Sequence, residues 1–200
     1  MHIEFVEAPA ALARLKTLHL SIAPGADGAS SVTVTGAPSS ATIRYFAADD
    51  GRRAAVPAVD AGISVAAWQL PSIVEAALHK LHCPEAFAMP KSTWRNVTDV
   101  VAVALKNNRK WMAVDAALGV ELNTADALVI HPSEHHLLRD LVQAMLLHGD
   151  SPSQGLVVCA TSGLLAIDIS PPGSVTFSVA SESAADQIRA LCCHLKQAID

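Results

Sequence analysis

The residues best suited to chemistry lie in one short stretch, HPSEHH at positions 131–136. Zinc binds imidazole nitrogens and carboxylate oxygens, so His131 with Glu134 or His135 could supply two ligands. His148 stands at the far end of the helix expected here and cannot join them. A metal site therefore requires a further ligand from elsewhere, such as His2, His19 or a second copy of the chain. The plainer interpretation is a solvated helix start, where the helix N-terminus favours Glu134 without any metal.

A second group of such residues is HKLHC at positions 79–83. His79 and His82 are three residues apart, so they can share one face of a helix. Cys83 stands immediately before Pro84, where a helix is expected to end, and no CxxC motif accompanies it. We therefore interpret this group as the polar, frayed end of a helix.

Motifs for nucleotide binding and covalent catalysis are absent from the sequence. Neither of the standard glycine-rich phosphate loops occurs. Gly149-Asp150-Ser151 superficially resembles the nucleophile block of one esterase class, but it follows an expected helix instead of a strand. The GxSxG elbow is absent as well. We therefore predict no cofactor and no covalent catalysis.

The composition indicates a cytoplasmic protein that buries much apolar surface. Apolar residues make up 51% of the chain and charged residues 16%, which favours an extended buried surface or an oligomer interface. No apolar run approaches the ~20 residues that cross a bilayer, so no membrane is expected. Glu4 and Glu7 stand where a signal peptide would be basic, and the four cysteines show no disulfide spacing. The alanine-rich composition suggests a bacterial source.

The charge balance argues against nucleic acid as a partner. The formal net charge is −5, from 14 basic and 19 acidic residues with the histidines neutral. No basic cluster carries the interleaved aromatic residues that are typical of nucleic-acid binding. Protonation of all nine histidines would bring the net charge to +4, so we expect poor solubility near pH 6.

The clearest structural pattern lies in residues 155–199. Apolar residues run through 156–159 and alternate with polar residues in 165–169 and 175–179, with turns between them. This alternation predicts three strands with one buried face, on which Asp168, Thr176 and Ser178 would face solvent or a partner. Ser183 and Asp186 have capping-box spacing and begin a helix. The apolar stripe of that helix comprises Ile188, Leu191, Cys192, Leu195 and Ile199.

The first part of the chain predicts a similar order of elements. Strands are expected at 2–6, 32–34, 42–46, 53–56 and 63–65, a hairpin turn at 49–51, and helices at 9–20 and 71–82. A shift of 114 positions places Val74 on Ile188 and Leu81 on Leu195. Two related halves are therefore one interpretation, and the chance likeness of two amphipathic helices is the other.

The middle of the chain predicts mainly helices, at 92–105, 111–118 and 132–148. The stretch 82–91, with Pro84 and Pro90, is the best candidate for a domain boundary. We therefore divide the chain into three units: an N-terminal α+β half (1–84), a mainly helical connector (85–131), and a C-terminal unit of helix, three strands and helix (132–200).

The helix at 92–105 is apolar over an unusually wide arc. It therefore lies either at the centre of the fold or at an interface, and we take Val97, Val101 and Leu105 as candidates for a dimer interface. Three tryptophans fall near expected helix starts. We expect them to anchor the core, with a binding face as the alternative: Trp68, Trp94 and Trp111.

These patterns predict an α+β fold of antiparallel β-meanders packed against helices, with two related halves around a central helical segment as an open alternative. The expected function is that of a non-enzymatic interaction or binding protein of the cytosol, acting as a homodimer. The alternative is a small metal-dependent or small-molecule-processing enzyme that uses the 131–136 region. A cleft that brings His131, Glu134 and a further histidine within ligand distance would favour the enzyme.

Overall fold

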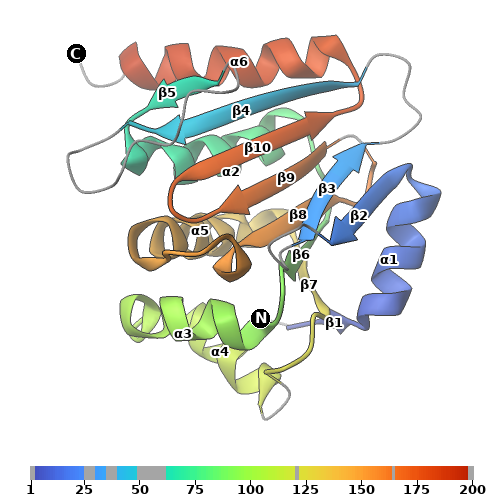
Figure 1. Ribbon diagram of the computed structural model, residues 1–200, viewed down its shortest axis with the longest axis vertical. Coiled ribbons are helices and arrows are strands. Elements are labelled where there is room, and N and C mark those ends of the chain that lie inside the picture. Colours follow the sequence, from blue (N-terminus) through green and yellow to red (C-terminus); the bar gives the residue numbers. More distant parts are fainter. Residues whose placement is uncertain are drawn as a thin grey trace.

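The computed structural model describes residues 3–24, 30–34, 40–48, 62–119, 122–163 and 165–197. They form an α+β fold in which helices cover an eight-stranded sheet (Figure 1). The helices are α1 (Ala8–Thr17), α2 (Leu70–Lys80), α3 (Trp94–Leu105), α4 (Arg109–Leu118), α5 (His135–His148) and α6 (Glu182–Gln197). The strands are β1 (Phe5–Val6), β2 (Leu20–Pro24), β3 (Ser30–Val34), β4 (Ala41–Ala47), β5 (Ile63–Val65), β6 (Ala86–Pro90), β7 (Ala127–Ile130), β8 (Leu156–Ala160), β9 (Leu165–Ser170) and β10 (Ser174–Val179).

The sheet runs in the order β1-β7-β6-β8-β9-β10-β4-β5. Its neighbouring strands are antiparallel, apart from the parallel pair β4–β5. β2 and β3 form a separate antiparallel hairpin in which Leu20 lies opposite Val34. Figure 1 shows this hairpin in front of the sheet and α2 and α5 behind it. The α+β class predicted from the sequence is therefore confirmed.

Side-chain alternation along β9 shows how the sheet separates two cores. Leu165, Ile167 and Ile169 belong to the larger core, on the face that the helices cover. Ala166, between them, belongs to the smaller core on the opposite face. The larger core takes its helical residues from α2, α3, α4, α5 and α6, whereas the smaller one joins α1 to β6 and β8.

The elements expected at the C-terminus are confirmed. β8, β9 and β10 are consecutive neighbours in the sheet, and α6 follows them directly. The five other expected helices correspond to α1 to α5, with a short 3-10 turn at Pro132–Glu134 before α5. No helix in the part of the chain described here is long and apolar enough to cross a membrane. The hairpin turn at 49–51 and the strand at 53–56 lie outside the described residues.

Residues 82–91, the candidate domain boundary, contain a buried strand. Residues 86–90 form β6, which lies between β7 and β8 and is buried along its whole length. A strand buried on both faces lacks the polar alternation that marks a half-exposed strand. The sheet also takes strands from all three units of the division at 84 and 131, including β6 and β7 from the expected helical connector.

The two proposed halves of the chain correspond in their helices, α2 and α6, but not in the strands that precede those helices. Val74, Ala77 and Leu78 of α2 are buried, as Ile188 of α6 is, so the helical stripes correspond in part. The strands before them differ, because β9 and β10 are antiparallel neighbours whereas β4 and β5 are parallel. Strand pairing therefore favours a chance likeness of two amphipathic helices over a duplication.

A buried ion pair joins the end of β6 to β9. Lys91 Nζ lies 2.8 Å from Asp168 Oδ1 and 2.7 Å from Ser170 Oγ, and the Ser170 hydroxyl donates to the same carboxylate at 2.8 Å. The side chains of Lys91 and Asp168 are 5% and 16% exposed. The sequence predicts that Asp168 faces solvent or a partner. In the structure its carboxylate instead contacts Lys91 of the same chain.

We expect Lys91→Ala to destabilise the fold by about 3 kcal/mol, because it leaves a largely buried carboxylate without its cation. Urea unfolding followed by circular dichroism measures the loss. Lys106→Ala removes an exposed lysine at the end of α3 and serves as the control. A loss below about 1 kcal/mol, the range of surface ion pairs, would contradict the buried character of the pair.

Candidate binding groove

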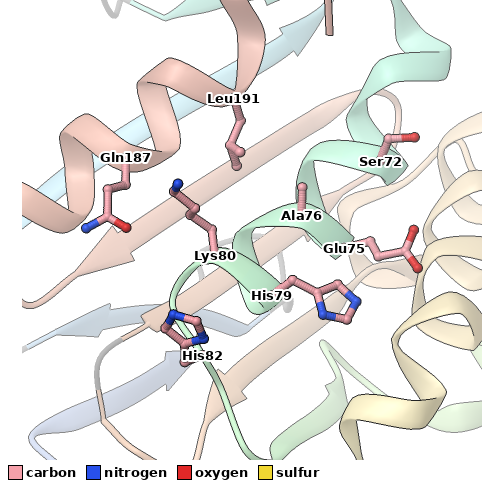
Figure 2. A pocket seen from close by; sticks show the side chains of 8 residues that line it. All are labelled: Ser72, Glu75, Ala76, His79, Lys80, His82, Gln187 and Leu191. Atoms are coloured by element: carbon pink, nitrogen blue, oxygen red, sulfur yellow. The ribbon is translucent and has the colours of Figure 1, made fainter. Parts of the chain in front are cut away.

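α2 and α6 border an open groove of about 660 Å³ (Figure 2). Most of its wall comes from α2 and the turn that follows it. Along α2 the groove extends from Ser72 to Lys80, about 12 Å at 1.5 Å per residue. The residues that line it are Ser72, Glu75, Ala76, His79, Lys80, His82, Gln187 and Leu191.

The groove exists because α2 is amphipathic. One stripe of the helix is buried in the larger core and fixes which side faces outward. Glu75 and His79, four residues apart, lie on one side of the outward surface, while Lys80 extends toward α6 (Figure 2). The turn after α2 contains His82, whose φ of 50° stops the helix. The buried stripe comprises Ile73, Val74, Ala77 and Leu78.

The two histidine clusters of the sequence meet at this place. The ring of His79 on α2 packs edge-on against the ring of His135 on α5, with centroids 4.6 Å apart and planes at 68°. One helical turn away, Arg139 Nη1 of α5 lies 3.3 Å from Glu75 Oε2 of α2. The two contacts lie one helical turn apart between antiparallel helices. Glu75 precedes His79 by four residues, and Arg139 follows His135 by four.

His135 is the most unusual residue of the cluster. Its side chain is 1% exposed, and neither ring nitrogen has a hydrogen-bond partner in the structure. Burial, followed by the nearby His79 and His136, lowers the pKa of His135 to about 4, so the imidazole is neutral at pH 7. The expectation of a solvated helix start is therefore wrong for His135. It is also wrong for Glu134, which is buried and accepts a long hydrogen bond of 3.4 Å from the His131 backbone.

The structure does not assemble the metal site considered from the sequence. Among the residues it describes, no group of three or more His, Cys, Asp or Glu side chains is arranged to hold a metal ion. Glu134 is engaged with the backbone of His131, and the ring next to His135 belongs to His79. The partner of His135 is thus a residue that the metal hypothesis did not include.

The groove carries basic side chains without acidic partners. Glu75 contributes the carboxylate of the lining, and it is paired with Arg139. The side chains of His79, Lys80 and His82 form no ion pair with any part of the chain that the structure describes. The formal net charge of −5 counts the histidines as neutral, so on the same count Lys80 is the unpaired charge of this wall, and His79 and His82 add positive charge when they are protonated.

The residues considered for a dimer interface lie inside the protomer. Val97, Val101 and Leu105 of α3 are buried in the larger core, so the wide apolar arc marks a central helix and not a free face. An interface between copies cannot use these three side chains while the fold is intact. Trp94 and Trp111 are also core residues, as expected, whereas Trp68 is exposed at the start of α2.

The described cysteines are poor nucleophiles. Cys83 and Cys159 are free and buried, and burial raises their pKa values to about 11 and about 12. Both remain protonated at neutral pH, whereas a reactive cysteine requires a lowered pKa and access to solvent. Neither thiol provides covalent chemistry at the groove.

The sequence pointed to both histidine clusters but not to their contact or to the groove. The outward positions of α2 were the available signal, because His79 and Lys80 alternate with its buried stripe. The contribution of α6 could not be seen, since it depends on how two distant helices pack. Comparisons with protein-family models, with curated proteins and with solved structures found no match.

Proposed function

We propose that the protein is a non-enzymatic binding protein whose α2–α6 groove receives an acidic, partly apolar segment of a partner protein. The observation that carries the proposal is the set of three basic side chains, His79, Lys80 and His82, that line the groove without an ion-pair partner among the described residues. Glu75 offsets them only in part, because Arg139, which also pairs with Asp140, lies 3.3 Å from it.

The shape of the groove favours a polypeptide segment over a small molecule. Small-molecule sites are concave and bury most of the ligand, whereas this groove is open along about 12 Å of α2. An extended chain advances about 3.3 Å per residue, so about four residues match this length. Such a segment lies in an open groove with one side still exposed to solvent.

The chemistry of the lining favours acidic residues interspersed with apolar ones. Ala76 and Leu191 supply apolar surface, and Lys80 extends toward Leu191 across the groove (Figure 2). The last turn of a helix also favours basic side chains through its dipole, which accounts for His79 and Lys80 as helix residues. The helix dipole does not account for the groove beside His79 and Lys80. A carboxylate in the groove would complement these two side chains.

An enzyme that uses the 131–136 region is the second candidate, and one observation favours it. A neutral, buried imidazole at His135 has two nitrogens free for a substrate or a proton. Turnover that His135→Gln abolishes without loss of folding would support this candidate over binding alone. The homodimer and the cytoplasmic location stay predictions, and native mass spectrometry of the untagged protein counts its subunits.

A selection from a displayed library of random 12-residue peptides tests the binding proposal. We expect the enriched peptides to combine Asp or Glu with Leu or Phe, and we call the most enriched one the probe peptide. Fluorescence anisotropy then gives its Kd. We expect Lys80→Glu to weaken binding at least tenfold, because it places a like charge beside the acidic segment.

The control is Lys106→Glu, the same charge reversal at an exposed position at the end of α3. It should leave the Kd within a factor of two, apart from the general effect of net charge. Enrichment of basic peptides, or equal losses from the two variants, would contradict the proposal. Free glutamate that binds as tightly as the probe peptide would point instead to a small-molecule site.

A further inference from the structure

The burial of both His135 ring nitrogens without a hydrogen-bond partner is unfavourable, and the packing of the fold does not explain it. A buried polar atom without a partner destabilises a fold, and native proteins rarely retain one. His135 has two such atoms on one ring, at 1% exposure. Because the imidazole is neutral at pH 7, one nitrogen carries a hydrogen and is an unused donor.

The position of His135 connects this unused donor to the groove. The ring of His79, which lines the groove, packs against the ring of His135. His79 is an exposed residue in the last turn of α2, so its ring can change rotamer without a shift of either helix. Figure 2 shows His79 on the side of α2 that is turned toward α5.

Two carboxylates on the helices that carry this pair are already engaged. Arg139 contacts both Glu75 and Asp140, and Asp140 also accepts a hydrogen bond of 2.9 Å from Asn108 Nδ2. Neither carboxylate is hydrogen-bonded to His135. Among the residues that the structure describes, no carboxylate is hydrogen-bonded to the ring of His135.

We propose that the His79–His135 end of the groove is a subsite for one carboxylate of the bound acidic segment. His79 turns aside, and the ring N–H of His135 donates a hydrogen bond to a carboxylate oxygen of the ligand. A hydrogen bond to an ionised acceptor is stronger than one between neutral groups, and a buried setting strengthens it further. The inference rests on the proposed function and adds the residue that reads the acidic group.

Nuclear magnetic resonance of protein with ¹⁵N-labelled histidine tests the subsite in the wild-type chain. The His135 ring signals are assigned by their loss in His135→Phe. On addition of the probe peptide we expect the His135 N–H proton to move downfield and to exchange more slowly with water. The same peptide with every Glu and Asp changed to Gln and Asn should leave the signal in place.

Affinity supplies the second readout. We expect His135→Phe, which keeps an aromatic ring and removes both nitrogens, to weaken binding of the probe peptide about tenfold. His148→Phe, at the exposed far end of α5, is the matched control and should leave the Kd within a factor of two. If His135→Phe fails to fold, the resonance measurement on the wild-type protein still decides.

The outcomes separate the two proposals. Tight binding of the probe peptide with an unmoved His135 signal would overturn the subsite and leave the binding groove intact. A shift that the neutral peptide also produces would overturn it too, because a carboxylate would then not be the cause. If no peptide binds at any concentration tested, both proposals fail.

Discussion

Val101→Asp is expected to abolish the folded state. Val101 is fully buried on α3 in the larger core, and an aspartate there would be a buried charge without a partner. Changes of this kind cost more than about 4 kcal/mol, against a total stability of about 5–15 kcal/mol for a typical protein. Circular dichroism and a thermal melt measure the loss. We expect a protein that is unfolded, or that melts well below the wild type.

The same helix provides a matched control two residues away. Val103 is 77% exposed, so Val103→Asp makes the same chemical change in contact with solvent. It should alter the free energy of unfolding by about 0.5 kcal/mol or less. A stable Val101→Asp protein with a changed subunit number would contradict the burial of Val101 and return α3 to the role of a dimer interface.

Trp94→Ala is expected to cost about 3–5 kcal/mol, the usual range for removal of a buried aromatic side chain. Trp94 is fully buried at the start of α3 and meets the ring of Phe5 edge-on, at 5.9 Å between centroids. Its indole Nε1 donates to the backbone carbonyl of Asp126 at 2.8 Å. Asp126 in turn accepts from the Ala8 backbone through its carboxylate, so Trp94 supports the start of α1 as well.

Trp68→Ala is the matched control, since Trp68 is 57% exposed at the start of α2. It should cost about 0.5 kcal/mol or less by urea unfolding. Trp94→Phe separates packing from hydrogen bonding, because it keeps a ring and removes the donor to Asp126. We expect that variant to lose about 1–3 kcal/mol. Equal losses from Trp94→Ala and Trp68→Ala would contradict the assignment of Trp94 to the core.

The sequence predicts well where its patterns have a single physical cause. β9 and β10 alternate because one face meets the larger core, so their strands and turns can be read from Leu165 to Val179. β6 could not be read in this way. Its residues 86–90 are all buried, which removes the alternation, and Pro84 and Pro90 beside it are typical of a loop.

The candidate site depends on contacts that no local pattern contains. The contact of His79 with His135 requires α2 and α5 to pack antiparallel in one register, which the Glu75–Arg139 pair shares. Hydrophobic periodicity shows which side of each helix is buried but not which helix it meets. The partner of Lys91 could not be predicted for the same reason. Asp168 lies near Lys91 only because β6 and β9 flank β8 in the sheet.

These contacts connect the fold to its proposed role. The buried stripe of α2 directs His79 and Lys80 outward, and α6 supplies the opposite wall of the groove. The Glu75–Arg139 pair reduces the negative charge that would otherwise oppose an acidic ligand. The proposal of a binding role rests on this groove and on the basic side chains that line it.

The location of the bound peptide tests the central claim most directly. Two-dimensional ¹H–¹⁵N spectra of the wild-type protein, recorded during titration with the probe peptide, report which backbone amides change. The proposal predicts that the largest changes lie along the groove, at Ser72, Ala76, His79, Lys80 and Leu191. Changes that centre on α1, on the β2–β3 hairpin or on the exposed side of α3 at Val103, with the groove unaffected, would contradict it.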